Sequence, residues 1–177
     1  VNRTREEILL NTNNKLKNID IIKFKNYLLR RCQKEPMAYI LGYKHFWKHK
    51  FLTNNSVLIP RPDTELIIEE TLRYLPINKS KKILDVGTGS GCIIVSLLKE
   101  RPKCAATAID ISKKAINVAK MNAKLHQLDN KINFININID KYKSSNYDLI
   151  ISNPPYINSI DLNRLDDDIK FHEPMLA

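Results

Sequence analysis

The stretch ILDVGTGSGC, residues 83–92, decides the fold expected for this chain. Its apolar start predicts a buried β-strand, and Gly87, Gly89 and Gly91 follow directly. Glycine has no Cβ atom, so such a loop lets the backbone approach a ligand closely just before a helix begins. The helix expected next is CIIVSLLKE, residues 92–100. The segment therefore predicts a strand, a ligand-binding loop and a helix.

A dinucleotide is not the expected ligand of this loop. The dinucleotide fingerprint requires a third glycine at the position that Cys92 occupies here. Asp110 ends the second predicted strand, where a carboxylate can accept hydrogen bonds from both ribose hydroxyls. Asp140 follows the third strand. A glycine loop with acids at these two strand ends suits S-adenosylmethionine, and the alternative is a tight turn that binds nothing.

Strands and helices alternate through most of the chain. Residues 62–75 begin with proline and acids, which is typical of a helix N-terminus. The alternation predicts an α/β fold with a parallel, doubly wound sheet. The expected strands are residues 81–87, 105–110, 132–137 and 147–152, and the helices between the first three are residues 92–100 and 113–127.

The first 61 residues show a different pattern of apolar residues. Apolar residues recur near helical spacing within residues 18–32, which predicts an amphipathic helix. Two short apolar runs flank Thr53, Asn54 and Asn55, so a β-hairpin with its turn at these residues is expected. We divide the chain into three parts on this basis. They are a partial helical domain at residues 1–45, a hairpin connector at 46–61 and an α/β domain at 62–177.

The fourth predicted strand ends on Asn153, Pro154, Pro155 and Tyr156. Ligands of open α/β sheets bind at the carboxyl ends of the strands, so this motif is expected to face the glycine loop. The prolines fix φ and lack an N–H, which makes the turn rigid and rich in acceptors. The Asn153 side-chain oxygen and the Pro154 carbonyl can hold a planar NH2 group against a methyl donor, with the Tyr156 ring packed on its plane. A plain turn is the alternative.

Charge and composition narrow the class of protein. Residues 1–50 hold 12 Lys+Arg and 4 Asp+Glu of a chain with net charge +10. This asymmetry fits a nucleic-acid partner and fits a solvated helix face equally well. No window approaches the roughly 18 apolar residues of a membrane span, so we expect a cytoplasmic protein without membrane contact. Cys32, Cys92 and Cys104 lack metal-ligand spacing, and we expect reduced thiols and no metal.

The motifs together resemble a known family. DVGTGSGC, AID and ISNPPY are similar to the class I S-adenosylmethionine-dependent methyltransferases that act on amino groups. EPMAYILGYKHFW, LIPRPDTE and FHEPMLA further resemble the peptide chain release factor glutamine methyltransferase family. That family methylates the side-chain nitrogen of the glutamine in the Gly-Gly-Gln motif of release factors. The resemblance implies a Rossmann-like fold, S-adenosyl-L-methionine as cofactor, and release factors gripped by the front helical domain.

The resemblance also implies roles for individual residues. Asp140 falls where this family contacts adenine, although Lys141 stands where an aromatic residue often follows that acid. The implied cofactor-binding residues are Gly87, Thr88, Gly89, Ser90, Gly91, Asp110, Asp140, Lys141 and Asn153. The implied catalytic residues, which hold the glutamine, are Asn153, Pro154, Pro155 and Tyr156.

The extent of the chain leaves two alternatives to this function. A complete sheet of this fold has seven strands, and this chain ends soon after the fourth, so we expect a domain truncated at its C-terminal end. One alternative is a nucleic-acid methyltransferase acting on adenine or guanine, which the basic charge and the shared NPPY motif favour. The other is a non-catalytic remnant, which the truncation favours. We expect a monomer.

Overall fold

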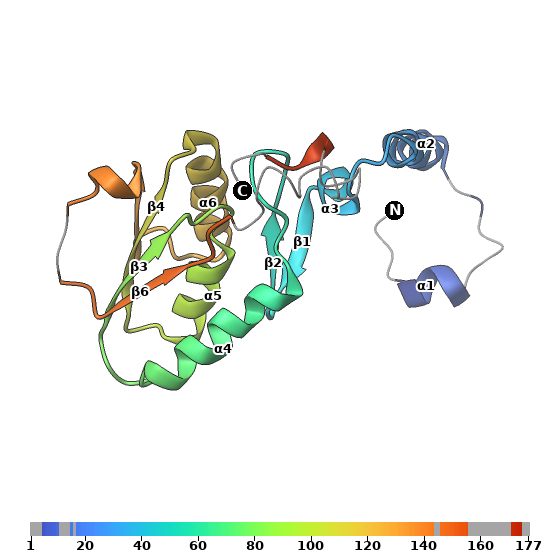
Figure 1. The fold of residues 1–177 in the computed structure, drawn as a ribbon. Coiled ribbons are helices and arrows are strands. Elements are labelled where there is room, and N and C mark those ends of the chain that lie inside the picture. Colours follow the sequence, from blue (N-terminus) through green and yellow to red (C-terminus); the bar gives the residue numbers. More distant parts are fainter. Residues whose placement is uncertain (1–4, 11–14, 16, 144–145, 156–170, 175–177) are drawn as a thin grey trace.

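The computed structural model describes residues 5–10, 15, 17–143, 146–155 and 171–174 (Figure 1). None of the helices in these ranges is long and apolar enough to cross a membrane. The helices are α1 (Arg5–Leu10), α2 (Asn18–Cys32), α3 (Met37–Leu41), α4 (Glu65–Tyr74), α5 (Cys92–Glu100) and α6 (Lys113–Leu125), with 3-10 helices η1 (Pro62–Thr64) and η2 (Ile139–Lys141). The strands are β1 (Tyr43–Phe46), β2 (His49–Leu52), β3 (Lys82–Val86), β4 (Ala105–Asp110), β5 (Ile132–Asn136) and β6 (Leu149–Ser152).

Strands β3 to β6 form one parallel sheet in the order β5-β4-β3-β6. Asp85 of β3 lies opposite Ala108 of β4 on one side and Ile151 of β6 on the other. The chain therefore builds outward from β3 through β4 and β5, and then returns to the far side of β3 for β6. The predicted Rossmann-like fold class is confirmed. A reversal of strand order of this kind is where open α/β sheets bind their ligands.

Helix α5 occupies the centre of the core. Every residue from Cys92 to Leu98 is buried, as expected for a helix that is apolar on all sides. It lies between the sheet and the β1–β2 hairpin (Figure 1). Phe46 and Phe51 of the hairpin belong to the same apolar cluster as Ile83 of β3 and the buried residues of α5. The hairpin is thus part of the α/β core and brings the segment that follows it to the edge of the sheet.

The predicted hairpin is confirmed, but the predicted position of its turn is wrong. The turn lies at Trp47 and Lys48 between β1 and β2, and residues 53–55 come after the second strand. Trp47 adopts a positive φ of 54°. Its backbone N–H donates to Glu65 Oε1 at 2.7 Å, and its indole Nε1 donates to Glu100 Oε1 at 2.9 Å. Contacts from α4 and α5 therefore hold a turn that the local residue types do not indicate.

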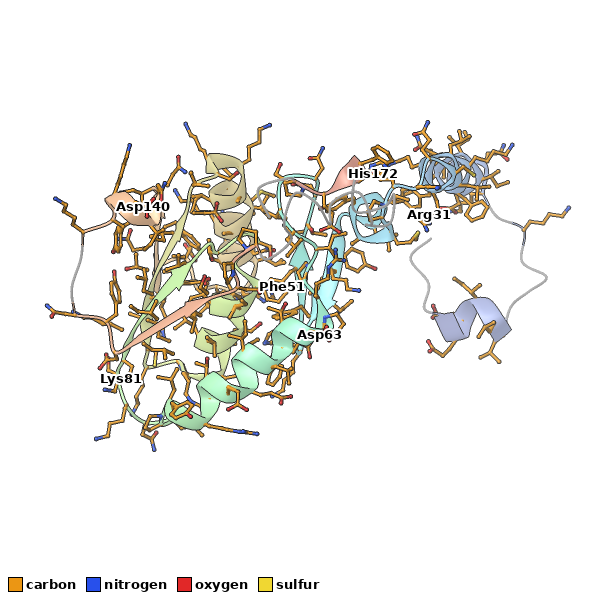
Figure 2. All side chains as sticks on the ribbon, viewed as in Figure 1. Arg31, Phe51, Asp63, Lys81, Asp140 and His172 are labelled. Carbon is orange, nitrogen blue, oxygen red and sulfur yellow. The ribbon has the colours of Figure 1, made fainter. Side chains whose placement is uncertain are left out.

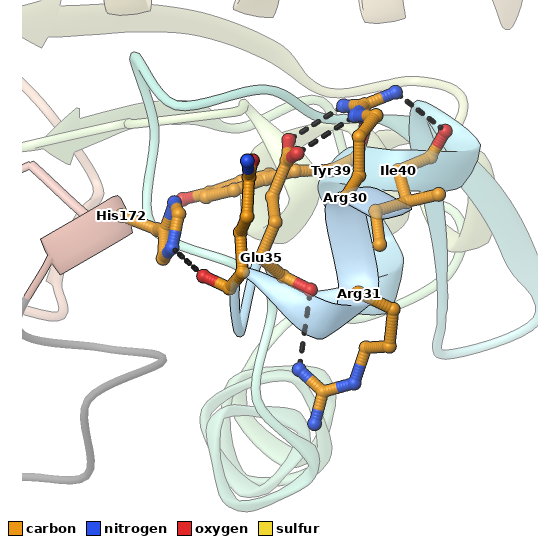
Figure 3. A network of polar contacts seen from close by, with 7 residues as sticks. Arg30, Arg31, Glu35, Tyr39, Ile40 and His172 are labelled. Carbon is orange, nitrogen blue, oxygen red and sulfur yellow. Dashed lines mark hydrogen bonds and ion pairs between the residues drawn. The ribbon is translucent and has the colours of Figure 1, made fainter. Parts of the chain in front are cut away.

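The front helices differ in how much they pack. Helix α2 spans the residues that the apolar spacing predicts, yet none of them is buried, and Ile22 and Leu29 are 63% and 67% exposed. Helix α3 is instead buried at Tyr39. Arg30 connects the two, since its Nε donates to Glu35 Oε2 at 2.7 Å and its Nη2 donates to the Tyr39 carbonyl at 3.2 Å (Figure 3). These hydrogen bonds attach the C-terminal end of α2 to α3, the helix next to the hairpin.

Candidate active site

A cavity of about 310 Å³ lies at the carboxyl ends of the four parallel strands. Its volume falls within the range of small-molecule sites. Each strand contributes the stretch that follows it, and the linker after the hairpin completes the wall. These stretches are residues 86–90 at the end of β3, 109–112 at the end of β4, 137–139 after β5, Asn153 and Pro155 after β6, and Arg61 and Thr64 from the linker and η1.

The glycine loop between β3 and α5 has a backbone that other residues rarely adopt. Gly87, Gly89 and Gly91 have φ values of 71°, 56° and 77°, which lie in the left-handed region that favours glycine. Gly91 also lies against α6, because a Cβ atom there would come 3.2 Å from the Cβ of Ala119. The loop can therefore turn tightly at the cavity wall, with its backbone open to a ligand.

Asp110 joins the end of β4 to the glycine loop. Its Oδ2 accepts a hydrogen bond from the Gly89 N–H at 2.9 Å, and its Oδ1 accepts one from the Ser112 N–H at 2.8 Å. A carboxylate oxygen has more than one acceptor site, and Asp110 lines the cavity. The carboxylate can therefore accept hydrogen bonds from ribose hydroxyls while it holds the loop. The bond to Gly89 is a contact that sequence reasoning did not identify.

Asp85 is buried below the glycine loop. Asp85 is 1% exposed, and its Oδ2 accepts a hydrogen bond from Thr88 Oγ1 at 2.6 Å. Its Oδ1 has no partner among the described residues. Burial raises the pKa of Asp85 to about 7. The hydrogen bond from Thr88 lowers this pKa and the negative charge of Asp110 raises it, but both effects are smaller than that of burial. A buried carboxyl oxygen without a partner is an exception that requires an explanation.

The raised pKa of Asp85 predicts a pH dependence of stability. In the unfolded chain this carboxyl ionises near pH 4 (about 3.9 for free Asp), whereas in the folded chain it keeps its proton up to about pH 7. Stability should therefore fall as pH rises from about 4 to about 7, by on the order of 2–4 kcal/mol, and level off above that. Chemical denaturation across this range, with Asp85→Asn as the comparison, measures the effect. A constant stability difference between the two proteins would contradict the assignment.

Asn153 is oriented by a residue from the other side of the cavity. Its Nδ2 donates to Thr64 Oγ1 at 3.3 Å, and Thr64 is 9% exposed. The amide nitrogen is thereby turned to Thr64, which leaves the amide oxygen to accept a hydrogen bond from a substrate. Thr64 is a site residue that sequence reasoning missed. Its only signal was its place in the LIPRPDTE segment, residues 58–65.

The structure does not bring every predicted residue to the cavity. Asp140 and Lys141 are exposed on η2, and the cavity wall there consists of residues 137–139 instead. Figure 2 shows Asp140 at the outer edge of the molecule. Pro154 is exposed and is not part of the cavity wall. Tyr156 lies outside the described residues.

The cysteines are free thiols in the structure. Cys92 and Cys104 are buried, and Cys32 is exposed. Burial raises the pKa of Cys92 to about 12, so this thiol stays protonated at the cavity wall. Within the described ranges, no three His, Cys, Asp or Glu side chains are grouped so that they could hold a metal ion.

A parallel sheet with a glycine loop and acidic strand ends around one cavity defines a Rossmann-like class of cofactor-binding proteins. Comparison with known families makes this more specific. The family model for the methyltransferase small domain matches residues 64–165, and the model for the PrmC N-terminal domain matches residues 1–42. The chain belongs to the methyltransferase small domain family. Its resemblance to the release factor glutamine methyltransferase family is likewise confirmed.

Individual relatives match nearly the whole chain. The release factor glutamine methyltransferase of Flavobacterium psychrophilum is 39% identical over 98% of this chain and 62% of its own length. The protein of the same name from Caulobacter vibrioides is 37% identical over 98% and 61%. The chain thus spans about three fifths of these relatives. A solved putative S-adenosylmethionine-dependent methyltransferase of Methanococcus maripaludis has a TM-score of 0.46 and 22% identity, covering 62% of this chain and 47% of that one.

Proposed function

We propose that this chain belongs to an enzyme that methylates the side-chain amide nitrogen of glutamine in the Gly-Gly-Gln motif of peptide chain release factors. The main observation in support is that Asn153, after β6, lines the same cavity as the glycine loop and Asp110. The names of the relatives support the substrate class. Methylation of a release factor would place the protein in translation termination in the cytoplasm.

The residues around the cavity fit S-adenosylmethionine as the cofactor. Bound there, it would supply an electrophilic methyl group. Backbone groups of residues 87–91 and the Asp110 carboxylate would hold its polar parts, because a loop without Cβ atoms permits close approach. Asp85 is not part of the cavity wall and would act on the cofactor through Thr88, which lines the cavity and donates to Asp85 Oδ2. The exposed positions of Asp140 and Lys141 make residues 137–139 the nearer candidates for the adenine wall.

Asn153 and Pro154 would prepare the substrate amide for attack. An amide nitrogen is a weak nucleophile because its lone pair is delocalised over the carbonyl. The Asn153 amide oxygen would accept one N–H of the glutamine. The carbonyl of Pro154, which is exposed beside the cavity wall, would accept the other, and together they would aim the lone pair at the methyl carbon. Holding two reactants in line in this way can be worth roughly 7–11 kcal/mol. The nitrogen gains a methyl group and then releases a proton readily, so no strong base is required.

The three parts of the chain would have different roles in this function. The helical front, residues 1–45, would bind the release factor, and residues 46–61 would connect it to the methyltransferase domain at 62–177. The basic charge of residues 1–50 and the exposed apolar side chains of α2 give that front a surface for a large partner. The fixed connection between α3 and the hairpin linker would present the partner to the cavity.

Transfer of a radiolabelled methyl group tests the proposed substrate. The protein is incubated with an intact release factor, with the same factor carrying alanine in place of the Gly-Gly-Gln glutamine, and with RNA and DNA. We expect label only in the intact factor. Label in nucleic acid would support the alternative methyltransferase. Cofactor binding without label in any acceptor, in an assay where the Flavobacterium psychrophilum relative labels the factor, would support a non-catalytic remnant.

A further inference from the structure

Arg61 and Glu173 form an ion pair beside the cavity, although they are 112 residues apart in the sequence. Arg61 Nη2 donates to Glu173 Oε1 at 2.5 Å. The Glu173 side chain is 3% exposed and that of Arg61 is 35% exposed. Arg61 and Pro174 both line the cavity that Asn153 lines. The pair therefore lies where a substrate would enter, with the carboxylate inside and the guanidinium partly open.

The pair leaves much of its hydrogen-bonding capacity unused. A guanidinium has five N–H donors in a planar fork, and within the described part of the chain Arg61 makes only the bond to Glu173. Glu173 Oε2 is buried and has no partner there either. Buried polar groups nearly always have a hydrogen-bond partner, so the unpaired Glu173 Oε2 requires an explanation. The remaining donors of the Arg61 fork, at the wall of the cavity, therefore offer a place for a ligand.

Hydrogen bonds join the two segments that carry Arg61 and Glu173 to the front of the chain. The Tyr39 hydroxyl donates to the Val57 carbonyl at 2.7 Å, which fixes α3 to the linker that leads to Arg61. Burial and the charge of Glu173 raise the pKa of Tyr39. His172 Nε2 donates to the Gln33 carbonyl at 3.1 Å, and Figure 3 shows the His172 ring directed to this part of the front. Three distant segments therefore meet around the pair.

The charge of the pair selects the kind of acceptor. Arg61 and Glu173 together are neutral, and the carboxylate would repel a phosphate that approached the same fork. A neutral carbonyl meets no such repulsion and still receives a hydrogen bond from a charged donor. A peptide main chain offers such carbonyls, and glycine residues beside them leave room for the approach. A peptide is thus the better ligand than a nucleic-acid backbone.

We propose that Arg61 binds a main-chain carbonyl of the substrate peptide and that Glu173 is the positioning residue that holds its guanidinium. The identity of the peptide, a Gly-Gly-Gln segment, rests on the proposed function. The role of the pair in peptide recognition goes beyond it, because it makes residues outside the cofactor loop and the Asn153 turn responsible for substrate binding.

The test separates peptide recognition from protein stability by comparing the two single variants with the double variant. Arg61→Met or Glu173→Leu alone leaves an unpaired charge and should lower the melting temperature. The double variant leaves no charge behind and should melt near the parent, since apolar residues often replace a buried pair without loss. Binding of a fluorescent Gly-Gly-Gln peptide, with S-adenosylhomocysteine present, should weaken about tenfold or more in all three variants. Affinity for S-adenosylhomocysteine should stay within about twofold of the parent's.

A second ion pair provides the matched control. Lys81 Nζ and Asp148 Oδ1 are 2.7 Å apart, with both side chains about one third exposed, where β3 and β6 begin. Figure 2 shows Lys81 at the lower left of the view, well away from His172. Lys81→Met should leave peptide affinity unchanged.

The outcomes distinguish this inference from the proposed function. Parental peptide affinity in the double variant would overturn the role of the pair, and so would failure of the parent to bind the peptide. Displacement of the peptide by inorganic phosphate or an RNA oligonucleotide at the parental site, and not in the double variant, would overturn the choice of a carbonyl. Peptide binding without methyl transfer would overturn the proposed function alone.

Discussion

Asp110→Ala should weaken binding of S-adenosylmethionine by roughly 10²–10⁴-fold. The carboxylate would accept hydrogen bonds from two ribose hydroxyls, and each charge-assisted bond is worth about 1.5–3 kcal/mol. The same substitution removes the acceptor for the Gly89 N–H, which lies 2.9 Å from Asp110 Oδ2. The glycine loop should therefore lose part of its fixed shape together with the ribose contact. Isothermal titration calorimetry measures the affinity directly.

Two further variants identify the cause of that loss. Asp110→Asn keeps one acceptor oxygen but turns a donor to the N–H of either Gly89 or Ser112, so its affinity should fall between those of the parent and the alanine variant. Asp129→Ala removes an exposed carboxylate on the turn after α6 and should bind like the parent. Unchanged affinity in Asp110→Ala would show that this carboxylate does not hold the cofactor.

The sheet could be predicted from the sequence because its signals are local. Apolar strands of four to six residues alternate with helices, and the structure has β3, β4, β5 and β6 within the predicted ranges. The rule that parallel strands present their carboxyl ends at one edge then places Asp110 beside the glycine loop. The turn at Trp47 could not be predicted in this way, because Glu65 and Glu100 hold it from far along the chain.

The same limit explains the unpredicted parts of the site. The strand-end rule says which residues come near the cavity, but the loop after each strand decides where a side chain points. Asp140 is exposed on η2, whereas Asp85 is buried although it precedes the loop. The contacts of Asn153 with Thr64 and of Arg61 with Glu173 join segments that no local pattern relates. These depend on tertiary packing around the hairpin.

Asn153→Ala should slow methyl transfer to the release factor by roughly 10²–10³-fold, the cost of losing one preorganised hydrogen-bonding group aimed at the reacting atoms. Its affinity for S-adenosylmethionine should change far less, because the glycine loop and Asp110 remain. Single-turnover rates at saturating cofactor and substrate, together with calorimetry, separate the two quantities. Equal losses of rate and cofactor affinity would make Asn153 a cofactor ligand and not a substrate ligand.

Asn153→Asp and Thr64→Val test how the Asn153 side chain acts. A carboxylate keeps the acceptor oxygen, and the Thr64 hydroxyl, which accepts from Asn153 Nδ2 at 3.3 Å in the parent, can instead donate to it. Activity should therefore partly survive in Asn153→Asp. Thr64→Val removes the group that turns the amide nitrogen away from the substrate, so its rate should fall by less than that of Asn153→Ala. If all three variants methylate at the parental rate, Asn153 and the prolines after it form only a turn, and the substrate amide must be held elsewhere in the cavity.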